Sequence, residues 1–132
     1  MASVLSYAPI SDYPRRAHFD FYRSHPSPFY SVTFELDAGR LRERLAAEGA
    51  PVYAGLCWHF HRALLTLPAF RVRLAGDVLV LHDRLRMGLT VPAPRRTFTF
   101  ATFEWQPDWA AFAASARGVL ARASETIDLT GG

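Results

Sequence analysis

The sequence contains no lysine and a single cysteine, and each shortage excludes a class of protein. All 15 basic residues are arginines, spread from Arg15 to Arg122 without clustering, and the 12 acidic residues leave a formal net charge of +3. Because a nucleic-acid-binding surface needs a basic stripe or patch, we expect no nucleic-acid partner. The one cysteine, Cys57, cannot form a disulfide within the chain, and its apolar helical context predicts a buried, unreactive thiol.

Long hydrophobic runs and several enzyme motifs are absent as well. No stretch approaches the roughly 18 consecutive apolar residues of a membrane span, and the sequence does not open on a charged and then apolar leader. We therefore expect no membrane partner and a cytoplasmic location. The Gly-x-Ser-x-Gly motif of serine hydrolases, the His-Glu-x-x-His motif of zinc enzymes and paired cysteines are also missing, so no metal site is predicted.

Apolar residues are plentiful. The 132 residues are 50% hydrophobic and 14% aromatic, which is enough to bury a sizeable core. No repeat or low-complexity tract divides them, and we expect residues 1–132 to form a single domain. Helical and strand patterns are interleaved along the chain, which predicts an α/β fold in which helices pack on a mixed sheet.

The first half of the sequence predicts an irregular entry segment, a strand and two helices. Alternating apolar residues over 29–36 predict the strand. Asp37 is a suitable N-cap and Gly49 a suitable stop for the first helix. The second helix is expected from about Tyr53 to Leu67 and is apolar around most of its circumference, which predicts cover on more than one side. The irregular entry is indicated by four prolines: Pro9, Pro14, Pro26 and Pro28.

The second half predicts strands followed by one long helix. Residues 70–74 and 78–82, joined by Gly76 and Asp77, have the pattern of a β-hairpin. Two further strands are expected at 87–91 and 97–104. The last helix begins near Asp108 and presents one apolar face, formed by Trp109, Phe112, Ala116 and Leu120.

None of the five histidines has the sequence surroundings of a catalytic base. His59 and His61 lie two apart on a helix, so they point to different sides and cannot chelate one metal together. We expect one of them to be half exposed and the other hydrogen-bonded. His25 precedes a proline in a loop, and His82 ends a strand. Neither has a nucleophile or carboxylate at a spacing that would indicate a catalytic site. His18 lies in the aromatic stretch described next.

The segment RRAHFDFYR, from Arg15 to Arg23, gathers arginines, a histidine and three aromatic residues into nine positions. Together with FYSVTFELDAGRL, GLTV and TFTFATFEWQPDWAAF further along, it resembles the N-terminal half of the chloramphenicol acetyltransferases, from about Arg15 to Arg122. The resemblance implies a two-layer sandwich, a homotrimer, and acetyl transfer from acetyl-CoA to a hydroxyl of an antibiotic. The family's His-His-x-x-x-Asp-Gly motif, which carries the general base, does not occur in these 132 residues.

By position, the resemblance implies roles in binding and none in catalysis. Phe21 and Tyr22 match the aromatic pair that packs on the antibiotic, and Phe98 matches a further pocket aromatic. Phe100 stands where the family usually carries a smaller residue, and we include it in the expected pocket. Arg15 matches an arginine that forms a structural ion pair with the aspartate of the missing motif, so its usual partner is absent.

Two classes of function remain open on the sequence. The first is a partial domain of the acetyltransferase family, residues 1–132, which retains the pocket for chloramphenicol or a related acceptor. The second is an inactive truncated product, or a binding or oligomerisation module without chemistry. Because these residues lack the motif that carries the base, we expect the isolated polypeptide to be inactive, and acetyl-CoA is implied only as the co-substrate of the family.

Overall fold

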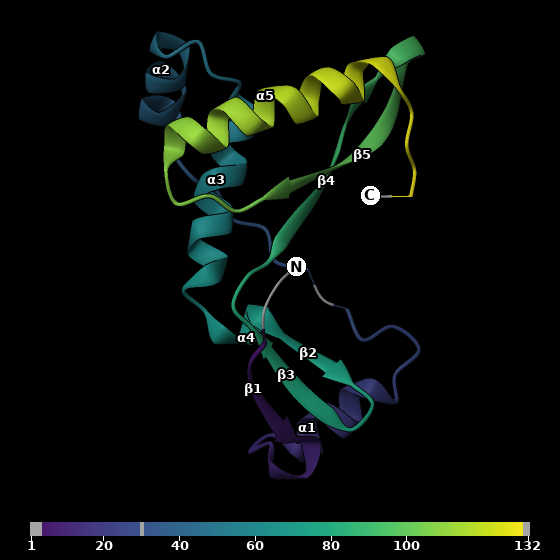
Figure 1. Ribbon diagram of the computed structural model, residues 1–132. Helices are drawn as coiled ribbons and strands as arrows, with labels where there is room; N and C mark the ends of the chain where they lie inside the picture. The colour runs from purple at the N-terminus through teal and green to yellow at the C-terminus, as the bar shows by residue number, and fades with distance from the viewer. Residues whose placement is uncertain (1–3, 30, 131–132) are drawn as a thin grey trace.

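The computed structural model describes residues 4–29 and 31–130, whose helices and strands form an α/β fold (Figure 1). Strands β1 (Val4–Pro9), β2 (Val72–Ala75) and β3 (Val78–His82) form one antiparallel sheet in the order β1-β3-β2. Strands β4 (Arg86–Ala93) and β5 (Thr97–Glu104) form a separate antiparallel pair. The α/β class is confirmed, but the described strands form two small antiparallel sheets where one mixed sheet was expected.

The helices link and cover the two sheets. Helix α5 (Trp109–Glu125) lies across the β4–β5 pair, and α3 (Val52–Leu65) extends from this region towards the three-stranded sheet (Figure 1). Helix α2 (Gly39–Ala47) packs on α3, and the short α4 (Pro68–Arg71) leads into β2. Helix α1 (Arg16–Arg23) lies at the far end of the molecule, beside the three-stranded sheet.

The largest buried cluster lies between α5, α3 and the β4–β5 pair. Phe103 on β5 and Phe112 on α5 are almost fully buried, with ring centroids 6.4 Å apart. The period-2 pattern of β5 turns Thr99, Ala101 and Phe103 towards α5 and leaves the alternate residues more exposed. Burial of these apolar side chains is the main source of stability for this end of the fold.

The predicted helix boundaries rest on local capping. The Asp108 carboxylate accepts a hydrogen bond of 2.7 Å from the Ala111 backbone N–H and caps α5. Asp37 accepts one of 2.8 Å from the Gly39 N–H beside the start of α2, but the N-cap position there is Ala38, one residue after the one expected. Gly49, with a positive φ of 59°, ends α2 as predicted, because glycine adopts this left-handed conformation without a steric penalty.

The predicted hairpin is confirmed, with Gly76 at a φ of 61° in the turn between β2 and β3. Residues 70 and 71, expected at the start of its first strand, belong instead to α4. Two elements of the entry region were missed: β1, which pairs with β3, and α1, which contains most of the aromatic stretch. Pairing with a distant strand is a tertiary contact, and the local proline pattern did not reveal it.

The strand expected over 29–36 is wrong for the described residues of that range. Residue 30 lies outside the described part of the chain, and Phe29 and residues 31–36 have no regular secondary structure. Val32, Phe34 and Leu36 are all more than half exposed. A strand needs a neighbour for its backbone N–H and C=O groups, and none of the described strands pairs with this segment.

The second expected helix is confirmed as α3, but its cover is incomplete. Trp58 is partly buried: its ring stacks on Trp105 at 5.7 Å, and its Nε1–H donates to the Gln106 carbonyl at 3.0 Å. Another side of α3 is open, and its large apolar side chains there are 37–46% exposed: Val52, Tyr53, Leu56 and Phe60. The predicted cover on more than one side is confirmed, because α3 packs against α2, α4 and α5, and this one side stays open.

Gly55 marks the closest packing of α3 on α2, and replacing it should separate the two helices. A Cβ atom at this position would lie 2.4 Å from Cδ1 and 3.1 Å from Cγ of Leu45, which is itself buried. We expect Gly55→Ala to lower the free energy of unfolding by about 1–3 kcal/mol.

Gly118→Ala on α5 is the matched control, because a Cβ atom at this position would meet only the far end of the Arg122 side chain, at 3.5 Å. That variant should gain about 0.5–1 kcal/mol from helix propensity. Urea unfolding measures both, and equal effects would contradict the packing argument.

Candidate functional site

A groove of about 830 Å³ runs beside α1, and we refer to it as the α1 groove. Its walls are aromatic: Tyr13, Phe19, Tyr22 and Phe29 all line it. The rings of Tyr13 and Phe19 meet edge to face, with centroids 6.4 Å apart. Apolar walls with a few polar groups are the usual composition of a small-molecule site.

The helical spacing of the aromatic stretch explains why one face of α1 forms the groove. Arg15, Phe19, Tyr22 and Arg23 recur at intervals of three and four residues, so they lie on one side of the helix. Asp20 lies outside this set and forms an ion pair with Arg16, with Nε and Oδ2 2.6 Å apart. The stretch thus folds as an amphipathic helix whose aromatic and cationic face borders the groove.

Arg15 and Arg23 bring two positive charges to the groove, and none of its described lining residues is acidic. The Arg15 guanidinium carbon lies 5.9 Å from the ring centroid of Tyr13, and that of Arg23 lies 5.8 Å from the centroid of Phe19. Both are at cation–π distance. Within the described part of the chain no carboxylate reaches ion-pair distance of Arg15.

His25 also lines the groove, although its sequence surroundings indicated no role. Its Nδ1 lies 2.8 Å from the carbonyl oxygen of Phe21. Since a carbonyl only accepts, Nδ1 carries the proton, and the Nε2 of a neutral His25 ring is unprotonated. The imidazole packs against the Phe21 ring at 4.5 Å. The spacing of four residues between Phe21 and His25 could have indicated this contact. It is informative only once α1 is known to be a helix that ends near His25.

The predicted pocket residues fall into two groups. Tyr22 lines the α1 groove. The ring of Phe21 lies against the ring of Tyr22, with ring centroids 5.2 Å apart. Phe98 and Phe100 lie together on β5, with centroids 6.0 Å apart and side chains 51% and 41% exposed. Figure 1 shows the beginning of β5 and helix α1 at opposite ends of the molecule. The structure therefore brings each pair together and keeps the two pairs apart.

Phe100 borders a second cavity of about 540 Å³ between β5 and the end of α5. The segment after α5 returns along β5: the Asp128 carbonyl accepts from the Phe100 N–H at 2.9 Å, and the Thr99 hydroxyl donates to the same carbonyl at 2.7 Å. Thr130 donates to the Asp128 side chain, which lowers the pKa of that carboxyl. These contacts fasten residues 126–130 to the sheet.

His61 and Cys57 lie inside the fold, away from the groove. His61 is fully buried and donates from Nε2 to the Leu85 carbonyl at 2.7 Å, whereas His59 is exposed, so the expectation of one hydrogen-bonded and one exposed histidine is confirmed. Burial lowers the pKa of His61 and raises that of the Cys57 thiol to about 11. The thiol is therefore protonated at neutral pH and unreactive, as predicted.

Because His61 is buried, we expect the free energy of unfolding to depend on pH. The folded-state pKa of His61 is lower than its unfolded value of about 6.5. Below that pH the unfolded chain binds a proton that the folded chain accepts less readily, so stability falls as the solution is acidified. Urea unfolding should give a smaller free energy at about pH 5 than at about pH 7.5. His61→Gln should flatten this dependence, whereas the exposed His59→Gln should keep it. If His59→Gln flattened the dependence and His61→Gln kept it, His61 would not be its source.

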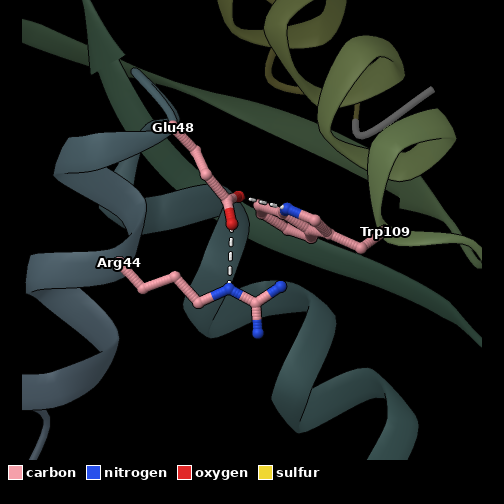
Figure 2. A network of polar contacts seen from close by, with 3 residues as sticks. All are labelled: Arg44, Glu48 and Trp109. Atoms are coloured by element: carbon pink, nitrogen blue, oxygen red, sulfur yellow. Dashed lines mark hydrogen bonds and ion pairs between the residues drawn. The ribbon is translucent and has the colours of Figure 1, made fainter.

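Glu48 joins α2 to α5 on another face (Figure 2). Its carboxylate accepts 2.8 Å and 2.7 Å hydrogen bonds from Arg44 Nε and Trp109 Nε1, respectively. These two bonds hold the pKa of Glu48 below its usual value. An exposed ion pair of this kind contributes little to stability, and the Trp109 bond links the end of α2 to the start of α5. Trp109, like Asp108, is therefore a structural residue at the start of α5.

Neither a metal-ligand cluster nor a membrane-spanning helix occurs among the described residues. No group of three or more histidine, cysteine, aspartate or glutamate side chains there is close enough to hold a metal ion. No described helix combines the length and hydropathy that a membrane crossing requires.

The described residues thus form an α/β fold with an aromatic groove beside α1, a lining of the kind that small-molecule sites have. Residues 5–131 match the family model described as chloramphenicol acetyltransferase. The chain belongs to the chloramphenicol acetyltransferase family.

Individual relatives agree with the family match. The chain is 30% identical to chloramphenicol acetyltransferase 2 of Escherichia coli and 26% identical to that of Haemophilus influenzae, over 113 residues in each case. It superimposes on a solved chloramphenicol acetyltransferase with a TM-score of 0.80 at 25% identity, covering 97% of this chain and 59% of that one. The matches cover 85% of this chain and 53% of each curated relative, so the chain spans about half of their length.

Proposed function

We propose that this chain supplies the acceptor-binding part of an acetyltransferase site that it shares with another subunit. The observation that carries the proposal is the α1 groove, whose wall includes Tyr22 in a chain of this family. Tyr22 is 58% exposed, so its side chain is accessible to a ligand, to which it offers an aromatic ring and a hydroxyl. Under the proposal the acceptor is chloramphenicol or a related aromatic alcohol, and residues 1–132 act as a partial domain of the family.

The reaction requires a base that we assign to the neighbouring subunit. The base removes the proton of the acceptor hydroxyl, the oxygen attacks the acetyl carbonyl of acetyl-CoA, and the thiolate of coenzyme A leaves and takes up the proton. A hydrogen-bond donor stabilises the developing oxyanion. In this chain Tyr22, Phe21 and the groove walls orient the acceptor. A trimer of the family type would place such a groove next to a neighbour's base.

Chloramphenicol binding tests the proposal on the isolated chain. We expect saturable binding by isothermal titration calorimetry, and Tyr22→Ala should raise the dissociation constant about tenfold through loss of aromatic contact. Phe70→Ala is a matched control, because Phe70 is 51% exposed and lies outside the residues that line the groove. An unchanged dissociation constant in Tyr22→Ala would remove the groove from the site.

A binding or oligomerisation module without chemistry is the second candidate. The observation that favours it is the open apolar side of α3, where Leu56 and Phe60 border a cavity of about 600 Å³ together with Val32, Phe34 and Leu36. Exposed apolar patches of this kind mark association surfaces. The two candidates differ in outcome: a module would associate with a partner subunit yet restore no acetylation, whereas the shared site requires both.

A further inference from the structure

We propose that the α1 groove selects aromatic molecules that carry a carboxylate or another anionic group. This inference rests on the proposed function and narrows the class of acceptor. It goes beyond the neutral antibiotic in the names of the relatives, and it comes from the charges of the groove itself. Two arginines, two histidines, two tyrosine hydroxyls and a serine provide its polar groups, and the described lining residues include no acid.

The two acidic residues closest to α1 in sequence make their contacts outside the groove. Asp20 is held by Arg16 at 2.6 Å, and Asp12 accepts a hydrogen bond of 2.9 Å from the Ser11 hydroxyl. Neither residue lines the groove. The charges of Arg15 and Arg23 therefore have no neutralising partner among the described residues. A ligand that brings a negative charge would satisfy them, whereas a neutral ligand leaves both unpaired.

The positions of the two guanidinium groups also favour an aromatic anion over a simple inorganic one. Arg15 lies against Tyr13 and Arg23 lies against Phe19, and these two rings meet edge to face. Both cations therefore border the same aromatic wall. A flat ring can pack on that wall while its carboxylate reaches a guanidinium fork, whose paired N–H donors match the two carboxylate oxygens.

The experiment compares two probes with the same ring. Para-nitrobenzoate carries a carboxylate and para-nitrobenzyl alcohol does not, and each is titrated into the full chain at low salt by calorimetry. Because the groove is open to solvent, we expect a moderate preference, with the benzoate bound about tenfold more tightly. The preference should shrink as salt is added, since screening weakens exposed charge interactions.

Matched variants assign the preference to the groove. Arg15→Gln and Arg23→Gln should each reduce it severalfold, and Arg15→Lys should retain part of it because the charge remains. Arg16→Gln is the control: Arg16 is on the same helix, pairs with Asp20 and does not line the groove. All of these side chains are partly or fully exposed, so the variants should fold.

The outcomes are distinct. Equal binding of the two probes, no binding of either probe, or a preference that Arg16→Gln reduces as much as Arg15→Gln does, would each overturn the inference. A benzoate preference that depends on Arg15 and Arg23 supports it. Failure of the proposed function is separate, because it would show as absent acetylation in a mixed assembly while this preference persists.

Discussion

Co-expression of this chain with a chloramphenicol acetyltransferase whose acceptor pocket is disabled, but whose catalytic motif is intact, is expected to restore acetylation of chloramphenicol. The chain alone is expected to show no measurable turnover. The reason is that, under the proposed function, the α1 groove holds the acceptor, whereas the family's His-His-x-x-x-Asp-Gly motif does not occur in these residues. Loss of a general base alone costs about 10²- to 10⁴-fold in rate. Release of the coenzyme A thiol is the measurement.

Variants of this chain show whether restored activity depends on the α1 groove. Tyr22→Ala should abolish the restored activity, whereas Phe70→Ala, outside the groove, should leave it intact. A complex that co-purifies but restores nothing would favour the module without chemistry, and failure to co-purify would count against a shared site. Turnover by the chain alone that disappears in His25→Ala would place the base in this groove and overturn its assignment to a neighbour.

The largest expected effect on stability comes from Phe112→Ala. Phe112 is 1% exposed, and its ring packs against Phe103 and Trp109 at the centre of the main buried cluster. Removing the ring loses its transfer free energy and leaves a cavity, which together cost about 3–5 kcal/mol. A domain of this size has about 5–15 kcal/mol of stability in total, so the variant should be largely destabilised.

Urea unfolding followed by tryptophan fluorescence measures this loss, because Trp58, Trp105 and Trp109 lie in or beside the cluster. Phe29→Ala is the control, since Phe29 is 88% exposed and should change the free energy of unfolding by less than about 0.5 kcal/mol. A loss at Phe112 as small as that at Phe29 would show that the described core does not stabilise the chain.

Local elements were predictable wherever the determining interactions lie close in sequence. Asp108 caps α5 through a bond to a residue three positions away, and Gly49 and Gly76 adopt the positive φ that their positions require. The apolar spacing of α5 placed Phe112 and Ala116 in the core, where both are 1% exposed. The strand predicted at 97–104 has the same bounds as β5, and the one predicted at 87–91 lies within the slightly longer β4.

The errors arose where an element depends on a distant partner. Residues 29–36 have the alternation of a strand, yet no described strand pairs with their described members. Strand β1 has weak local signals and forms because β3, some seventy residues later, provides its hydrogen-bond partners. Alternation of apolar and polar residues predicts which face of a strand is buried. The strand forms only where a neighbouring strand provides hydrogen-bond partners for its backbone N–H and C=O groups.

The sequence by itself determined the family, the α/β class, the caps and turns, and the aromatic stretch that carries Arg15 and Tyr22, because these depend on residue identity and short-range spacing. Tertiary structure decided the rest. It grouped Arg15, Arg23 and Tyr22 in one groove, set Phe98 and Phe100 apart on β5, and oriented His25 through the Phe21 carbonyl. The physical reason is that charge neutralisation, burial and strand pairing depend on which distant groups come close together, and that is settled only when the chain folds.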